Sequence, residues 1–82
     1  MTNLKIRIYK IDETEPKTTV TVPVAVLKIA SKLIPRQAAE TLQAKGIDIH
    51  EIIRLSNNPD ARGTLVEVEE HDKNEKIVIA LE

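Results

Sequence analysis

The stretch NLKIRIYKI, residues 3–11, decides the fold of this chain of 82 residues. Apolar and polar side chains alternate along it, one set being Leu4, Ile6 and Ile8 and the other Lys5, Arg7 and Tyr9. A period of two places alternate residues on opposite faces of a strand. We therefore expect a strand over residues 3–11 with one face buried in a core.

A hairpin partner for this strand follows directly in the sequence. Residues 12–17 are mostly polar and contain Pro16, a composition typical of a turn. The next segment, TTVTV at 18–22, is β-branched throughout, and such residues favour strands. The first 22 residues are therefore predicted to form a β-hairpin.

The middle of the chain begins with an apolar segment, VAVLKIASKLI at 24–34, whose only plainly polar residues are Lys28, Ser31 and Lys32. Pro23 suits the first turn of a helix, and Pro35 ends or bends one. We expect a first helix here that is either central or has a second apolar face to cover. Its β-branched first residues leave a strand as an alternative.

Two shorter helices are expected next. The good helix formers of RQAAETLQAK at 36–45 precede Gly46, a residue suited to a left-handed cap. A third helix is expected from 49 to about 56, because Asp48 can accept a backbone hydrogen bond at its start. Glu51, three residues on, is placed to reach back to the cap.

The chain closes with a second hairpin. The segments TLVEVEE at 64–70 and KIVIALE at 76–82 alternate like strands, and the turn-forming HDKNE separates them. In the first segment Leu65 shares a face with Glu67 and Glu69, and we expect these two carboxylates to point to solvent. The predicted order ββαααββ indicates an α+β fold, in which two β-hairpins flank a helical segment and a four-stranded, mainly antiparallel sheet has helices on one face. The pattern does not give the strand order.

The whole chain, residues 1–82, is expected to form a single small domain with an aliphatic core. Phe and Trp are absent, and the only aromatic residue is Tyr9. The residues predicted to form the core are Ile6, Ile8, Val20, Val22, Leu27, Leu33, Ile52, Leu55, Val66, Ile77, Ile79 and Leu81.

The composition argues against several classes of function. Without cysteine, the chain has no disulfide, thiolate nucleophile or sulfur-ligated metal. Its longest apolar stretch, 20–34, is interrupted and falls short of the ~20 residues that span a bilayer. Its N-terminus lacks the apolar run of a signal peptide. We expect a cytoplasmic domain with no transmembrane segment.

The sequence contains no recognisable catalytic or cofactor motif. His50 and His71 each adjoin a carboxylate, without the i, i+4 spacing that lets two ligands meet one metal. Ser31 and Ser56 lie in no nucleophile turn. The two glycines are too few for a phosphate-binding loop. We expect no catalytic residue, no metal and no cofactor, and hence no enzyme.

Charge is divided unevenly along the chain. Residues 1–46 hold eight Lys and Arg against four acidic residues, a net charge of plus four, whereas residues 47–82 hold four against nine, a net charge of minus five. Lys28, Lys32 and Arg36 are spaced by four, so a continuous helix would present them as one basic stripe. This stripe is a candidate contact for an anion or a partner, although most such rows are only the solvated side of a helix.

Three stretches resemble a family of short bacterial domains that occur alone or at the C-terminal end of YvlB-related proteins. They are VPVAVLKIASKLIP at 22–35, GIDIHEII at 46–53 and GTLVEVEEHDKNEKIVIALE at 63–82. None is a site signature, because they consist of core, cap and turn residues. The family is similar in having no established reaction, so the resemblance implies a fold and no catalytic residue.

Two functions of different classes remain as hypotheses. The leading one is a non-catalytic protein interaction or regulatory module that self-associates as a dimer through the first helix or an exposed sheet edge, alongside an unknown protein partner. The alternative is a binder of nucleic acid or anionic lipid through the basic stripe. Tight nucleic-acid binding is not expected, because the chain is net negative and has one aromatic residue.

Overall fold

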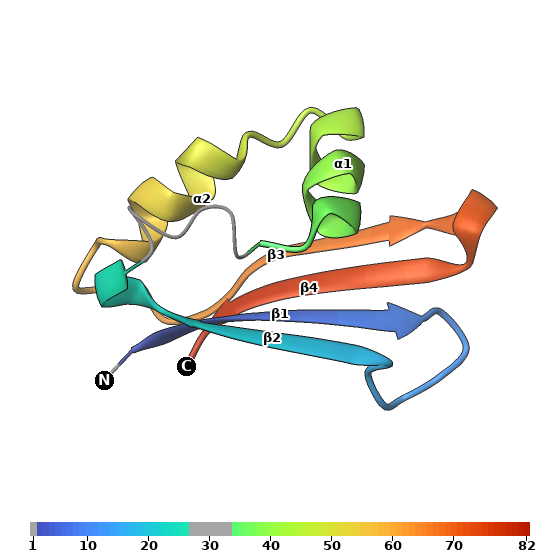
Figure 1. Cartoon of the computed structure of the whole chain (residues 1–82), viewed down its shortest axis with the longest axis horizontal. Coiled ribbons are helices and arrows are strands. Elements are labelled where there is room, and N and C mark those ends of the chain that lie inside the picture. Colours follow the sequence, from blue (N-terminus) through green and yellow to red (C-terminus); the bar gives the residue numbers. More distant parts are fainter. Residues whose placement is uncertain (1, 27–33) are drawn as a thin grey trace.

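A computed structural model describes residues 2–26 and 34–82 of the chain. Along the chain, one pair of strands precedes the helices and another follows them. In Figure 1 the helices lie above the strands. The elements are β1 Asn3–Lys10, β2 Thr18–Pro23, the 3-10 turn η1 Val24–Val26, α1 Arg36–Ala44, α2 Ile49–Ser56, β3 Gly63–Glu70, the 3-10 turn η3 His71–Lys73 and β4 Glu75–Leu81. The predicted α+β class, with helices between two hairpins, is confirmed.

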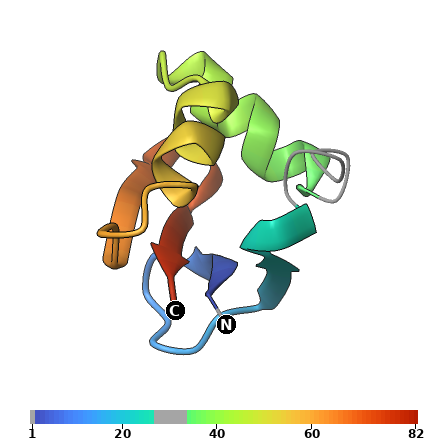
Figure 2. The same cartoon turned by 90° about the vertical axis from the view of Figure 1, so that its left-hand side faces the viewer.

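The four strands form one antiparallel sheet in the order β2-β1-β4-β3. Both predicted hairpins form, β1 pairing with β2 and β3 with β4, and the two hairpins join where β1 pairs with β4. The chain termini lie at the same end of this central pair (Figure 2), where the backbones of Asn3 and Glu82 exchange hydrogen bonds of 2.9 and 3.0 Å. The first and last strands therefore occupy the centre of the sheet, and β2 and β3 are its edges.

The first predicted helix lies mostly outside the described residues, since only the turn at 24–26 is described before residue 34. Pro23 is the last residue of β2, and the 3-10 turn η1 starts directly after it. It pairs with Asn3 in the register of an edge strand. A proline is tolerated there because the N–H that it lacks is not needed for the sheet.

Both shorter helices form where they were predicted. α1 starts directly after Pro35, and the chain turns at Gly46, whose φ of 78° is a left-handed value that favours glycine. Asp48 caps the start of α2, because its Oδ1 accepts a 2.9 Å hydrogen bond from the backbone N–H of His50. The carboxylate of Glu51, predicted to reach back to the cap, pairs instead with Arg54 one turn ahead.

The core lies between the helices and one face of the sheet. Of the predicted core residues, Ile6, Ile8, Val22, Ile52, Ile77, Ile79 and Leu81 are buried, and Val20 and Val66 are half-buried against them. Leu27 and Leu33 lie outside the described residues. The prediction for Leu55 is wrong, because its side chain is 46% exposed while α2 turns Ile52 and Ser56 inward. The core also includes Leu4, Ala38 and Leu42, all fully buried.

A bulge in β3 changes the face of one residue. The register between β3 and β4 shifts between Thr64 and Val66, so Leu65 leaves the face of Glu67 and Glu69 and packs against the core. The prediction that Leu65 shares the face of these carboxylates is therefore wrong. The carboxylates themselves are exposed, as predicted.

Polar contacts tie α1 to the sheet beside the core. Both carboxylate oxygens of the buried Glu75 accept hydrogen bonds of 2.5 Å from the side-chain amide of Gln37 in α1. The Nζ atom of Lys17 lies 3.4 Å from one of these oxygens. A buried carboxylate is tolerated only when it is paired and hydrogen-bonded in this way. These contacts hold α1 across the core-facing side of the sheet.

Candidate interaction surface

The basic stripe predicted from the sequence is described at only one of its three positions. Arg36 is the first residue of α1, and its side chain, 92% exposed, pairs with Glu40 at 3.0 Å. Lys28 and Lys32 lie outside the described residues. The stripe therefore stays a prediction, and its described member already has an acidic neighbour.

One face of the sheet carries the helices, and no described element covers the other (Figure 1). Residues that pair directly across antiparallel strands point to the same side. The register therefore assigns the following side chains to what we call the open face: Lys5, Arg7 and Tyr9 of β1, Lys76, Val78 and Ala80 of β4, Thr19 and Thr21 of β2, and Thr64, Glu67 and Glu69 of β3.

The open face is sorted by charge from strand to strand. Its side chains form three rows across β1, β4 and β3, which are Lys5, Ala80 and Thr64, then Arg7, Val78 and Glu67, then Tyr9, Lys76 and Glu69. We call the open-face side chains of one strand a column. The β1 column is basic at Lys5 and Arg7, and the β4 column is apolar at Ala80 and Val78 in the same two rows. The β3 column is acidic at Glu67 and Glu69. An apolar strip thus lies between opposite charges.

A bidentate ion pair lies at one end of the open face. The Nη1 and Nη2 atoms of Arg7 lie 2.5 and 2.9 Å from the carboxylate oxygens of Glu82, a geometry typical of strong Arg–carboxylate pairs. The hydrogen bond from Arg7, opposed by desolvation, lowers the pKa of Glu82, and the same bond raises the pKa of Arg7. The Arg7 side chain is still 24% exposed, so the guanidinium keeps a free side.

A cation–π contact orients the lysine of the third row. The Nζ atom of Lys76 lies 4.9 Å from the centre of the Tyr9 ring, within the range of a favourable contact. Lys76 belongs to β4 and Tyr9 to the neighbouring β1. The ammonium group therefore leans from the middle of the open face towards the basic column.

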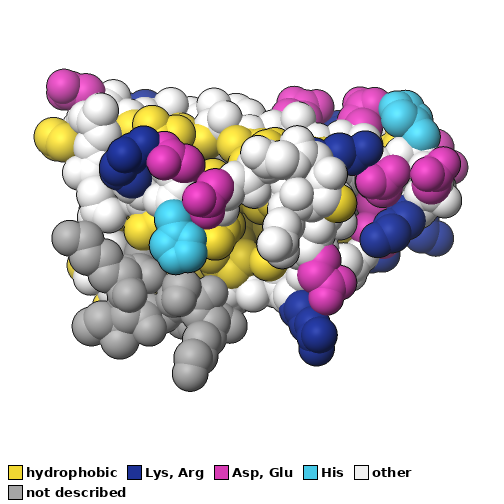
Figure 3. Space-filling model, turned by 90° about the horizontal axis from the view of Figure 1, so that it is seen from above, with side chains coloured by type: hydrophobic (Ala, Val, Ile, Leu, Met, Phe, Trp, Pro, Cys, Tyr) yellow, Lys and Arg dark blue, Asp and Glu magenta, His cyan; other side chains and the backbone are white. Residues whose placement is uncertain are grey.

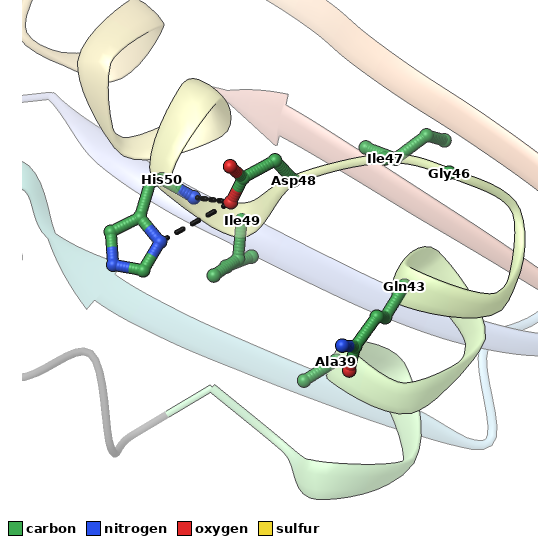
Figure 4. A pocket seen from close by; sticks show the side chains of 7 residues that line it. All are labelled: Ala39, Gln43, Gly46, Ile47, Asp48, Ile49 and His50. Carbon is green, nitrogen blue, oxygen red and sulfur yellow. Dashed lines mark hydrogen bonds and ion pairs between the residues drawn. The ribbon is translucent and has the colours of Figure 1, made fainter.

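On the opposite side of the molecule a hollow of about 490 Å³ lies between the two helices. Figure 3 shows hydrophobic side chains gathered on this side, with charged groups around them. Figure 4 shows Ala39 and Gln43 of α1 on one wall, and Ile47, Asp48 and His50 on the other. The hollow is open to solvent and partly apolar, and no group in it points to a particular ligand.

The histidines and the described serine take ordinary structural places. His50 Nδ1 lies 3.2 Å from Asp48, and His71 Nε2 lies 3.3 Å from Glu69. Within residues 2–26 and 34–82, no three His, Asp or Glu side chains lie close enough together to hold a metal ion. The hydroxyl of Ser56 donates to the carbonyl of Ile52, one turn back in α2.

A model of the C-terminal domain of YvlB-like proteins matches residues 2–80 of the chain. The chain belongs to this family. Among the described residues, the match covers every strand and helix of the YvlB-like domain except for Leu81 at the end of β4. No curated protein and no solved structure matches it. No helix in the described part of the domain is long and apolar enough to cross a membrane.

The open face was not singled out from the sequence, although part of its signal is visible there. Lys5 and Arg7 alternate with core residues in one strand, and Glu67 and Glu69 do so in another. The alternation shows that each pair faces solvent. Only the strand order β2-β1-β4-β3 shows that β4 separates them on one surface.

Proposed function

We propose that this YvlB-like domain is a non-catalytic module for protein interaction, acting in the bacterial cytoplasm and associating with a second copy of itself. The observation that carries the proposal is the open face, which no described element covers and which sorts its charges by strand. Separated basic and acidic columns suit a surface that fits a partner in one orientation.

The burial of the face also supports this proposal. Ala80 is 4% exposed and Val78 is half-buried, so the apolar strip is already partly shielded from water. The basic column and the acidic column flank the strip on either side. A surface of this kind offers a small apolar centre and a charged rim, the general anatomy of a protein interface.

The alternative function, binding of nucleic acid or anionic lipid through the basic stripe, draws less support from the described residues. Arg36 is the one described member, and Glu40 on the next turn offsets its charge. The open face carries Glu67 and Glu69 beside its basic residues, an arrangement that repels a polyanion.

Self-association is tested by measuring the mass in solution at several salt concentrations. We expect about twice the monomer mass of 9.2 kDa at about 1 mM protein and low salt. Added salt should return the monomer, because screening shortens the reach of charges from about 10 Å at 0.1 M to about 3 Å at 1 M. A monomer mass at 1 mM protein and low salt would contradict the proposal.

A further inference from the structure

We propose that two copies of the domain dock open face to open face, around a two-fold axis that runs along β4. The inference rests on the proposed self-association and specifies its geometry. It follows from the order of the columns on the open face, which is basic, apolar and acidic on β1, β4 and β3. A rotation by 180° about an axis along the middle column lays that column on itself and exchanges the outer two.

The rotation brings opposite charges together twice in the second row. Arg7 of one copy comes over Glu67 of the other, and the symmetry repeats the contact. Val78 of each copy meets its counterpart at the axis. The first row brings Lys5 over Thr64 and Ala80 over its counterpart. The carboxylate of Glu82, directly after β4, is drawn away from the axis by Arg7 of its own copy.

The third row fits the same axis because of the direction in which Lys76 leans. An upright Lys76 at the axis would face the same ammonium group of the second copy. Its contact with the Tyr9 ring at 4.9 Å instead draws it over β1. After the rotation β1 lies opposite the acidic column, so Lys76 reaches towards Glu69 of the second copy.

The size of this contact predicts a weak, reversible dimer. Three strands spaced about 4.8 Å apart, with a length of about 26 Å for the eight residues of β1, give roughly 370 Å² on each copy. The total of roughly 750 Å² is below the usual size of stable interfaces. The dimer should therefore form at high micromolar to millimolar concentrations and depend on its ion pairs.

Pairing through sheet edges is the competing arrangement for two copies. The edge strand β2 has no charged residue between Thr18 and Pro23, which leaves it open to pairing. A two-fold axis beside β2, however, brings the two basic columns towards each other, and an axis beside β3 brings the two acidic columns together. The charge pattern therefore favours the open face.

Paired charge reversals test the docking geometry through the mass in solution. The variants Arg7→Glu and Glu67→Arg should each bind their own kind at least about tenfold more weakly than the wild type, because each places like charges together twice. An equimolar mixture of the two should regain twice the monomer mass, because each reversed residue then meets its opposite. Glu13→Arg makes the same charge change as Glu67→Arg, but in the exposed β1–β2 loop, and should dimerise like the wild type.

A second variant covers the case in which Arg7→Glu fails to fold without its Glu82 pair. Val78→Asp keeps Arg7 and places two carboxylates against each other at the axis, so it should be monomeric at 1 mM. If Val78→Asp and Glu67→Arg both show the dimer mass of the wild type, the face-to-face docking is overturned while self-association stays intact. In that case Thr21→Pro, which removes an N–H directed away from β1 at the outer edge, should dissociate the dimer. A monomeric wild type would overturn both proposals.

Discussion

At the scale of single residues, Asp48 shows how one side chain fixes where an element begins. Its Oδ1 accepts hydrogen bonds from the backbone N–H and from the ring of His50, at 2.9 and 3.2 Å. Both bonds lower the pKa of Asp48, the backbone bond more than the ring bond, and slight desolvation opposes them. The ionised carboxylate is therefore part of the folded helix start.

Replacing this cap should destabilise the domain. Asp48→Ala is expected to lower Tm by about 5 °C, because the first turn of α2 loses an acceptor for its free N–H groups. Asp48→Asn is the matched control, since Asn caps nearly as well. A thermal unfolding curve of Asp48→Ala that overlays the wild type would contradict the role of the cap.

The same cap has a pH signature with a defined sign. The pKa of Asp48 is lower in the folded state than the ordinary value of about 3.9. Its contribution is therefore full above that value and is lost as the pH falls through the folded-state pKa. In thermal unfolding between pH 7 and pH 2, Asp48→Asn should lose less stability than the wild type. Equal losses would contradict this assignment.

The cap and the alternation of β1 could be predicted because both depend on neighbours in the sequence. Asp48 needs only the next few residues to act as a cap. The partner of Glu51 was predicted wrongly, because two local contacts compete for this carboxylate. The Arg54 side chain, one turn ahead, offers a charged partner, and the sequence does not rank that contact against the cap.

At the scale of elements, α1 and α2 bury narrow faces against the sheet. Leu42 is fully buried in α1, whereas Leu55 of α2 is 46% exposed. Leu55 was among the predicted core residues, three positions after Ile52 on the same helix. Which way a short helix rotates depends on the surface beneath it, and α2 turns Ile52 and Ser56 inward instead.

Truncating the two leucines should separate these environments. Leu42→Ala is expected to cost about 2–5 kcal/mol, since it leaves a cavity in the core. That is a large share of the roughly 4–12 kcal/mol expected for a chain of 82 residues. Leu55→Ala, the matched control with the same chemistry, should stay within about 0.5 kcal/mol. Urea denaturation of both variants checks this, and equal costs would contradict the assigned rotation of α2.

At the scale of the whole molecule, the strand order decides the surface chemistry. The two hairpins could be predicted because each is formed by adjacent segments with clear alternation. Their joining through β1 and β4 is a contact between the two ends of the chain, and no local pattern encodes it. The open face depends on that joining, which is why its residues could be predicted as exposed but not as one charge-sorted surface.

The most direct test of the self-association account is an NMR dilution series of the ¹⁵N-labelled domain at low salt, from about 1 mM downwards. If two copies dock through the open face, the amide signals of Arg7, Glu67 and Val78 should shift with concentration and stop shifting in high salt. The signals of Thr21 on the β2 edge and Gln43 on α1 should stay constant. Shifts confined to the β2 edge or to the helices would contradict the face-to-face docking, and no concentration dependence at all would contradict self-association itself.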